Sequence, residues 1–234
     1  MIQQDNTFIF DDISFAVDAH QCFELLRIKP GSRHALEFRD ILEEAQAVAR
    51  PKVTFCVAQA QERGDTCVDI GGVLFESSIL KINLEKSPVV FPFVATCGGE
   101  LDEFTGGSGG ALHRYWVDTI QMLALGTAMS MLEEHLKERV SPAELSCMNP
   151  GSLEDWPLQQ QSRMFDLLGE AAAKIGVSLT ESFVLVPLKS VSGIQFVTQE
   201  KFMNCQLCPR QNCEGRRAPY DACLYERRYG HSLK

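Results

Sequence analysis

Residues 179–196 read LTESFVLVPLKSVSGIQF and contain two apolar, β-branched segments, each preceded by a turn rich in hydroxyl groups. Such segments favour strands, so we predict strands over residues 184–187 and 193–198. Hydroxyl-bearing turns at strand ends can bind a small polar ligand through side chains and backbone. They can equally close a hairpin and satisfy only its own backbone. The stretch therefore predicts paired strands with a candidate ligand site at their turns, and both interpretations of the turns stay open.

The elements around this stretch predict the class of fold. Three β-rich segments in succession favour antiparallel pairing in a meander. They span residues 52–59, 66–75 and 89–96. Apolar residues at helical spacing predict the helices, which span residues 35–49, 111–138 and 158–175. The sum is an α+β fold, in which helices flank a twisted, mainly antiparallel sheet.

The composition is that of a soluble globular protein with an acidic balance. The chain has 234 residues, 45% of them hydrophobic, and a formal net charge of −9. The negative charge argues against a general nucleic-acid binder. No apolar run reaches the roughly 18 residues of a membrane span. The first residues, MIQQDNTFIFDD, are acidic where a secretory signal is basic. We therefore expect a cytoplasmic protein that binds neither nucleic acid nor membrane.

Four of the nine cysteines lie close to the C-terminus with the spacing Cys205-x2-Cys208-x4-Cys213-x9-Cys223. Thiolates are soft metal ligands, and a segment too small for its own core can fold around a metal. One CxxC followed by two single cysteines, with Pro209 directly after a ligand, is closer to iron–sulfur ligation than to the paired knuckles of zinc ribbons. We predict an iron–sulfur cluster at these cysteines, with zinc as the alternative.

The cysteine segment differs in charge from the rest of the chain. Residues 205–234 carry six Lys or Arg against three Asp or Glu. A basic segment can stabilise a negatively charged cluster, and it can also meet an acidic partner. We predict two units, a body of residues 1–200 and a metal-binding tail of residues 201–234. At least four of the five body cysteines are interpreted as buried free thiols; the five are Cys22, Cys56, Cys67, Cys97 and Cys147.

A second candidate ligand segment is SCMNPGSLEDWPLQQQ, residues 146–161, which we predict to be irregular. Residues 149–152 form a tight turn by composition. Pro157 suits the first turn of the helix that follows, and Asp155 suits its N-cap. Trp156 either packs onto the core or belongs to a ligand-binding loop, because loops with such particular chemistry often bind ligands.

Four segments resemble the reactivation (activation) domain of cobalamin-dependent methionine synthase, especially its short stand-alone members. The segments are LTESFVLVPLKSVSGIQF, NPGSLEDWPLQQQ, ATCGGELDEF and DTIQMLALGTAMSMLEE. The resemblance covers residues 85–200 well and residues 1–84 in the order of elements. The cysteine tail is similar to the tails of short relatives in anaerobes. The resemblance implies a C-shaped domain with a twisted antiparallel sheet and flanking helices.

The resemblance also implies an activity, which is to bind S-adenosylmethionine and support the reductive methylation of cob(II)alamin. The positions it implies for ligand contact are Pro150, Gly151, Glu181, Ser182, Ser190 and Ser192. The Pro-Gly turn departs from the family pattern at three positions. Cys147 stands where the family has Arg, Asn149 where it has Ala, and Ser152 where it has Tyr.

The functional hypothesis is a stand-alone reactivator of a corrinoid-binding methyltransferase protein. A 4Fe–4S cluster held by the four tail cysteines would deliver one electron to Co(II), and S-adenosylmethionine would trap Co(I) as methyl-Co(III). A redox donor such as a ferredoxin or flavodoxin would supply the electron. Two alternatives stay open, a non-catalytic interaction module stabilised by zinc and a corrinoid chaperone that loads the cofactor without redox chemistry.

Overall fold

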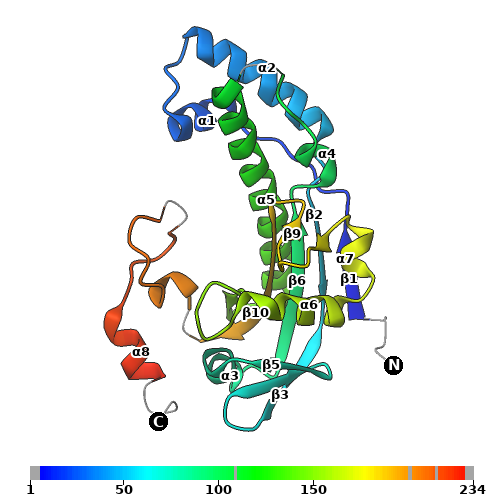
Figure 1. The fold of residues 1–234 in the computed structure, drawn as a ribbon, viewed down its shortest axis with the longest axis vertical. Coiled ribbons are helices and arrows are strands. Elements are labelled where there is room, and N and C mark those ends of the chain that lie inside the picture. The colour runs from blue at the N-terminus through cyan, green and yellow to red at the C-terminus, as the bar shows by residue number, and fades with distance from the viewer. Residues whose placement is uncertain (1–5, 108–109, 200–201, 214–215, 230–234) are drawn as a thin grey trace.

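The computed structural model describes residues 6–107, 110–199, 202–213 and 216–229 (Figure 1). The apolar segment Val89–Thr96 forms β6, the central strand of the sheet. It pairs antiparallel with β2 (Lys52–Cys56) and β3 (Ala58–Arg63) along one edge, and with β10 (Ser190–Thr198) along the other. All residues of β6 except Val89 are buried. A strand buried on both faces must be almost wholly apolar, which accounts for its sequence.

The remaining strands extend the sheet from this centre. They are β1 (Thr7–Phe10) beside β2, β4 (Cys67–Ile70) and β5 (Val73–Glu76) beyond β3, and β7 (Glu144–Met148) beside β10. All ladders of this eight-stranded sheet are antiparallel within the described residues. A separate pair is formed by β8 (Ser178–Leu179) and β9 (Leu185–Val186). The prediction of an α+β fold with an antiparallel sheet is confirmed.

Helices cover both faces of the sheet. The long helix α5 (Gly110–Val140) places Leu132 and Leu136 against Phe91 and Phe93 in one core cluster. The helices α3 (Ser78–Leu84) and α6 (Gln161–Leu168) contribute to clusters on the other side. The short helix α7 (Ala171–Lys174) follows α6 and is followed by Ile175, which belongs to one of these clusters. The first half of α5 packs with α1 (Ala19–Leu26), α2 (Arg33–Val48) and α4 (Gly99–Asp102) in a helical lobe beyond the sheet. Figure 1 shows α5 running from this lobe down along the sheet.

The predicted three-segment meander is wrong in its pairing. The segment 52–59 divides at Val57 into β2 and the start of β3, which lie one after the other along the same edge of β6. The meander is instead β3–β4–β5. The segment 66–75 divides because Gly71 and Gly72 have φ of 59° and 89°, in the left-handed region where a chain reverses direction.

Two further expectations about the segment around residue 160 are wrong. The predicted helix over residues 158–175 is a 3-10 turn (η2, Leu158–Gln160) followed by α6 and α7, which separate at Gly169. The stretch 146–161, predicted to be irregular, begins with the last three residues of β7. Both differences arise because strand pairing and the glycine conformation override the local apolar pattern.

Asp155 caps a helix, but not the one that follows it. Its carboxylate accepts hydrogen bonds from Ser77 Oγ and from the backbone N–H groups of Ser78 (3.3 Å) and Ile79 (3.0 Å). These are the free N–H groups at the start of α3. The prediction that Asp155 caps the helix after Pro157 is therefore wrong. Asp155 instead fastens the loop after β7 to α3, more than seventy residues earlier in the chain.

The cysteine tail packs on the body at both of its ends. At its start, Phe202 is 2% exposed and its N–H donates to Ser146 Oγ at 2.7 Å. At its end, Tyr229 follows α8 (Ala222–Arg228) and is fully buried. The Tyr229 hydroxyl donates to Asn83 Oδ1 at 2.9 Å. Phe202 and Tyr229 thereby share one core cluster with β7 and α3.

The described residues contain no helix that is both long and apolar enough to cross a membrane.

We expect Tyr229→Phe to destabilise the protein by about 1–3 kcal/mol, because Asn83 Oδ1 would be left buried without its donor. Tyr225→Phe is the matched control, since Tyr225 lies one turn earlier and is 42% exposed. It should change the free energy of unfolding by less than about 0.5 kcal/mol. Urea denaturation of the full chain measures both values. Equal stability of the two variants would show that the hydrogen bond between Tyr229 and Asn83 does not stabilise the attachment of the tail to α3.

Candidate ligand site and cysteine tail

The turn after β7 is a closed, well-bonded structure. Gly151 has φ of 78°, its N–H donates to the Trp156 carbonyl at 2.7 Å, and the Ser152 N–H donates to the Asn149 carbonyl at 3.2 Å. A side chain at Gly151 would also approach Leu158 Cδ1 to 2.8 Å. Trp156 is fully buried and packs edge-on against Phe75 at 6.1 Å between ring centroids. Of the two interpretations of Trp156, packing onto the core is therefore confirmed.

Asn149 joins this turn to β10. Its Nδ2 donates to the Ser192 carbonyl at 2.8 Å. The approach depends on Gly193, where a Cβ would lie 2.5 Å from Asn149 Nδ2 and 2.6 Å from the Met148 carbonyl oxygen. Real Cβ atoms do not tolerate such distances, so the sequence Ser-Gly fixes how closely β7 and its turn lie against β10.

Gln161 joins β10 to the turn between β8 and β9. Ser192 Oγ donates to Gln161 Oε1 at 2.8 Å, and Gln161 Nε2 donates to the Phe183 carbonyl at 2.6 Å. Ser192 and Gln161 are 2% and 5% exposed. Both hydroxyl-rich segments of the sequence are thus tied to one buried amide. Gln161 was not among the predicted site residues, because its partners lie about twenty and thirty residues away.

The six candidate ligand residues differ in how available they are. Pro150 and Ser192 are buried, whereas Glu181 and Ser182 are exposed on the turn that Gln161 holds. Ser190 is half-buried and its Oγ donates to Thr96 Oγ1 at 2.9 Å. Hydrogen bonds through Asn149 and Gln161 therefore connect the Pro150–Gly151 turn, the first half of β10 and the turn at 181–183. We call this connected region the β7–β10 seam.

The four tail cysteines are distributed over several turns of chain. Cys205 lies in a 3-10 turn (η3, Asn204–Gln206), and Cys223 lies exposed on α8. Arg216 ties the loop between them. Its guanidinium donates to the carbonyls of Cys205 (2.9 Å), Cys208 (3.2 Å) and Arg210. Within the described ranges, no group of three or more Cys, His, Asp or Glu side chains is positioned to hold a metal.

The donor set nevertheless fits an iron–sulfur cluster or zinc in its chemistry, because it consists of four thiols on one short segment. The backbone N–H of Arg217 also points at Cys205 Sγ, at 3.5 Å. Hydrogen bonds of this kind to ligand sulfurs tune bound clusters. Binding by all four thiols requires the segment 208–223 to rearrange, so the cysteines remain predicted ligands.

Burial raises the pKa of three body thiols, those of Cys56, Cys97 and Cys147, to about 12. For Cys147, desolvation is the largest cause and the nearby Arg217 acts against it. Burial also raises the pKa of Cys22. Such thiols are protonated and unreactive at neutral pH. All five body cysteines are free thiols, but only Cys22, Cys56 and Cys97 are buried, whereas Cys67 and Cys147 are partly exposed. The prediction of at least four buried thiols therefore holds for three.

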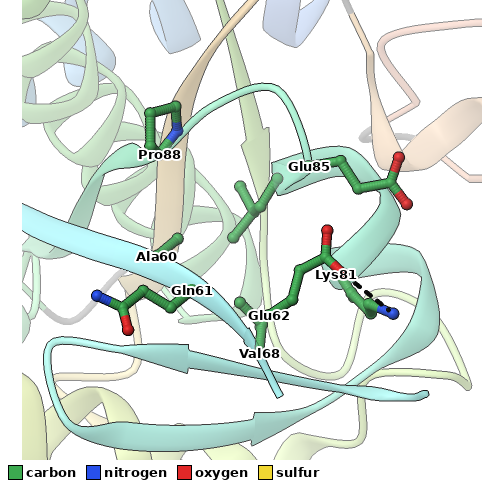
Figure 2. Close-up of a pocket in the computed structure, with 8 residues that line it drawn as sticks. Ala60, Gln61, Glu62, Val68, Lys81, Glu85 and Pro88 are labelled. Carbon is green, nitrogen blue, oxygen red and sulfur yellow. Dashed lines mark ion pairs between the residues drawn. The ribbon is translucent and has the colours of Figure 1, made fainter. Parts of the chain in front are cut away.

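A small cavity of about 60 Å³ lies between β3, β4 and α3, away from the seam (Figure 2). Its lining includes the ion pair of Lys81 Nζ with Glu62 Oε2 at 3.5 Å, beside the apolar side chains of Val68 and Pro88. Pockets for drug-sized ligands measure about 300 Å³ or more. This cavity is therefore too small to hold a nucleoside, and the seam remains the candidate ligand site.

Comparisons with known proteins show which proteins this chain resembles in sequence and in fold. The family model for the activation domain of vitamin B12 dependent methionine synthase matches residues 153–215. The crystal structure of the MetH reactivation domain bound to AdoHcy has a similar fold, with a TM-score of 0.58 and 15% sequence identity. The similarity covers 84% of this chain and 80% of that chain. No curated protein matches.

The resemblance predicted from the sequence is therefore confirmed, by the family match for residues 153–215 and by the fold for most of the chain. Residues 153–215 are thus similar in sequence to the methionine synthase activation domain, and most of the chain has the fold of the MetH reactivation domain. The family match includes the turn at 181–183 and Ser190 and Ser192, and it extends into the tail past Cys213. Pro150 and Gly151 lie immediately before it.

We expect Gly193→Ala to destabilise the protein by about 1–3 kcal/mol, because the new methyl group would overpack the contact between β10 and Asn149. Gly126→Ala on α5 is the matched control. A Cβ there meets nothing within 4 Å, so the change should leave stability equal or raise it by about 0.5–1 kcal/mol. Urea denaturation measures both variants. An unaffected Gly193→Ala protein would show that the seam is not closely packed.

Proposed function

We propose that this protein takes part in the reductive reactivation of a corrinoid-binding methyltransferase protein and binds S-adenosylmethionine at the β7–β10 seam. The observation that carries the proposal is that the activation-domain match, residues 153–215, includes the hydrogen-bonded core of the seam, Gln161, Ser190 and Ser192. The similar MetH domain was solved with AdoHcy, which is what S-adenosylmethionine becomes once it has donated its methyl group.

The corrinoid of the partner is the substrate of this reaction. Its Co(II) form takes up one electron to give Co(I), which then takes the methyl group of S-adenosylmethionine and releases AdoHcy. Methylation removes Co(I) and so draws an unfavourable reduction forward. The electron source and the methyl donor must therefore lie near each other. Asn204, next to Cys205, donates from Nδ2 to Asn149 Oδ1 at 3.3 Å, and this contact between tail and seam supports the proposal.

The electron would come through the tail. When bound to Cys205, Cys208, Cys213 and Cys223, a 4Fe–4S cluster supplies one-electron chemistry, and a ferredoxin or flavodoxin would recharge it. The contribution of the chain itself is to hold the ligand segment. Arg216 fixes the carbonyls around the CxxC pair, and the Arg217 N–H donates to Cys205 Sγ.

One observation favours a different role for the tail. Phe202 and Tyr229 anchor it to the body through apolar burial and hydrogen bonds that need no metal. A zinc-stabilised interaction module would use the same anchors without any redox chemistry. A corrinoid chaperone would bind the cofactor and load it without reducing it. Metal content and cobalamin reduction separate the three roles.

We expect protein purified without oxygen to be brown, to contain about four iron atoms per chain and to bleach with dithionite. The double variant Cys205→Ala/Cys208→Ala should lose the iron, whereas Cys67→Ala, a partly exposed thiol on β4, should keep it. With S-adenosylmethionine and reduced flavodoxin, the wild type should convert cob(II)alamin to methylcobalamin, and the double variant should not.

The other outcomes are equally informative. Colourless protein with about one zinc per chain and no cobalamin reduction would favour the interaction module. Protein that binds cob(II)alamin tightly but reduces none of it, with or without metal, would favour the chaperone.

A further inference from the structure

The body of the protein leaves the β7–β10 seam without a positive charge next to its central turn. Residues 145–153, LSCMNPGSL, are all uncharged, and the exposed turn between β8 and β9 contributes the acidic Glu181. An amino-acid ligand such as AdoHcy carries a carboxylate, which proteins usually bind through Arg or through several N–H groups. A cation that binds this carboxylate would have to come from outside residues 145–153.

The start of the tail contacts the seam through two adjacent residues, and Arg217 contacts the residue that follows them. Met203 forms a parallel bridge with Cys147 on β7, and Asn204 donates to Asn149 in the turn. Cys205 follows directly, and its sulfur accepts the N–H of Arg217 at 3.5 Å. The start of the tail thus lies alongside the end of β7, and Arg217, twelve residues after Cys205, lies against it.

The guanidinium of Arg217 is available for a ligand. Arg217 is exposed, and in the part of the chain that the structure describes no carboxylate lies within ion-pair distance of its side chain. Its neighbour Arg216 differs, since the guanidinium of Arg216 is occupied by carbonyl groups of the tail. The positive charge of Arg217 also reaches the seam, where it lowers the pKa of the Cys147 thiol against the effect of burial.

Two polar atoms near this position also have no partner. Gln195 is 4% exposed, and no hydrogen bond reaches its Oε1 within the described structure. It stands directly opposite Cys147 in the pairing of β10 with β7, so the two side chains share the α5 face of the sheet, opposite to the face on which Ser192 bonds Gln161. Asn204 Oδ1 is likewise buried without a partner. Buried polar atoms of this kind commonly have an absent partner such as a ligand.

We propose that Arg217 binds the carboxylate of an amino-acid ligand at the β7–β10 seam, so that the tail completes a site that the body alone leaves without a cation. The amide oxygen of Asn204, whose Nδ2 bonds Asn149 in the turn, is an acceptor for the ligand's ammonium group. This inference rests on the proposed function, because it takes the seam as the binding site for S-adenosylmethionine and AdoHcy.

Arg217 links the ligand to the tail cysteines. The backbone of Arg217 bonds the sulfur of Cys205, while its side chain would bond the ligand. Arg217 also lies within the segment 208–223, which has to rearrange for all four thiols to bind a metal, so metal binding would move the group that holds the carboxylate. Ligand affinity and metal content are coupled through this one residue.

The test compares two ligands by isothermal titration calorimetry on anaerobically purified full-length protein. AdoHcy carries the carboxylate and the ammonium group, whereas 5′-methylthioadenosine lacks both. Arg217→Ala should weaken AdoHcy binding by about 10- to 100-fold and leave 5′-methylthioadenosine unchanged. Arg217→Lys should retain part of the AdoHcy affinity, because it keeps the charge but loses the bidentate geometry. Arg210→Ala, an exposed arginine of the same tail, is the matched control and should change neither affinity.

The outcomes separate the inference from the proposed function. If the wild type binds AdoHcy and Arg217→Ala binds it equally well, Arg217 does not hold the carboxylate, while the proposed function stands. If Arg217→Ala weakens both ligands equally, its role is structural and the inference is again wrong. If the wild type binds neither ligand, the methyl-donor half of the proposed function fails, and the inference fails with it.

Discussion

The pairing of β10 with a strand on each edge is the constraint on which the rest of the structure depends. β10 bonds β6 over seven residue pairs and β7 over five, and these pairings overlap from Ile194 to Phe196. β7 and the turn that follows it are connected to the central strand β6 by strand pairing only through β10. Gly193 lies directly before this overlap and allows Asn149 and the Met148 carbonyl to approach β10 closely. Because strand register cannot slip without turning each buried side chain outward, this pairing fixes the positions of Asn149 and Ser192 together.

The sequence predicted those parts of the fold whose signal is local. The apolar run of β6 and the helical spacing of α2 and α5 are properties of the segments themselves, and both appear with nearly the predicted boundaries. β7 was missed because its five residues, ELSCM, are too few and too mixed to show a period, and its partner lies fifty residues later. Asp155 was assigned to the wrong helix for the same reason, since capping chemistry identifies the residue type but not the helix that receives it.

In the candidate site, too, the sequence predicted the local features and missed those that depend on distant partners. Motif chemistry identified the Pro150–Gly151 turn and the two hydroxyl-rich segments, and the structure connects these three regions. The connecting residues, Asn149 and Gln161, could not be predicted, because an amide has no distinctive pattern until its partners are known. The spacing of the tail cysteines predicted ligand chemistry. It contained no information on Tyr229, whose single hydroxyl bonds to α3 and positions the end of the tail.

The two anchors of the tail bear on how four separated thiols could come together. Cys205 lies three residues after the buried Phe202, and Cys223 lies six residues before the buried Tyr229. The first and last predicted ligands are therefore held near fixed points of the body, and a metal has to order only the chain between them. The entropy of closing that loop is smaller than for a free tail, because its ends are already constrained. A body that fixes both ends of a ligand segment favours metal binding after folding, in contrast to small metal domains that fold only around their ion.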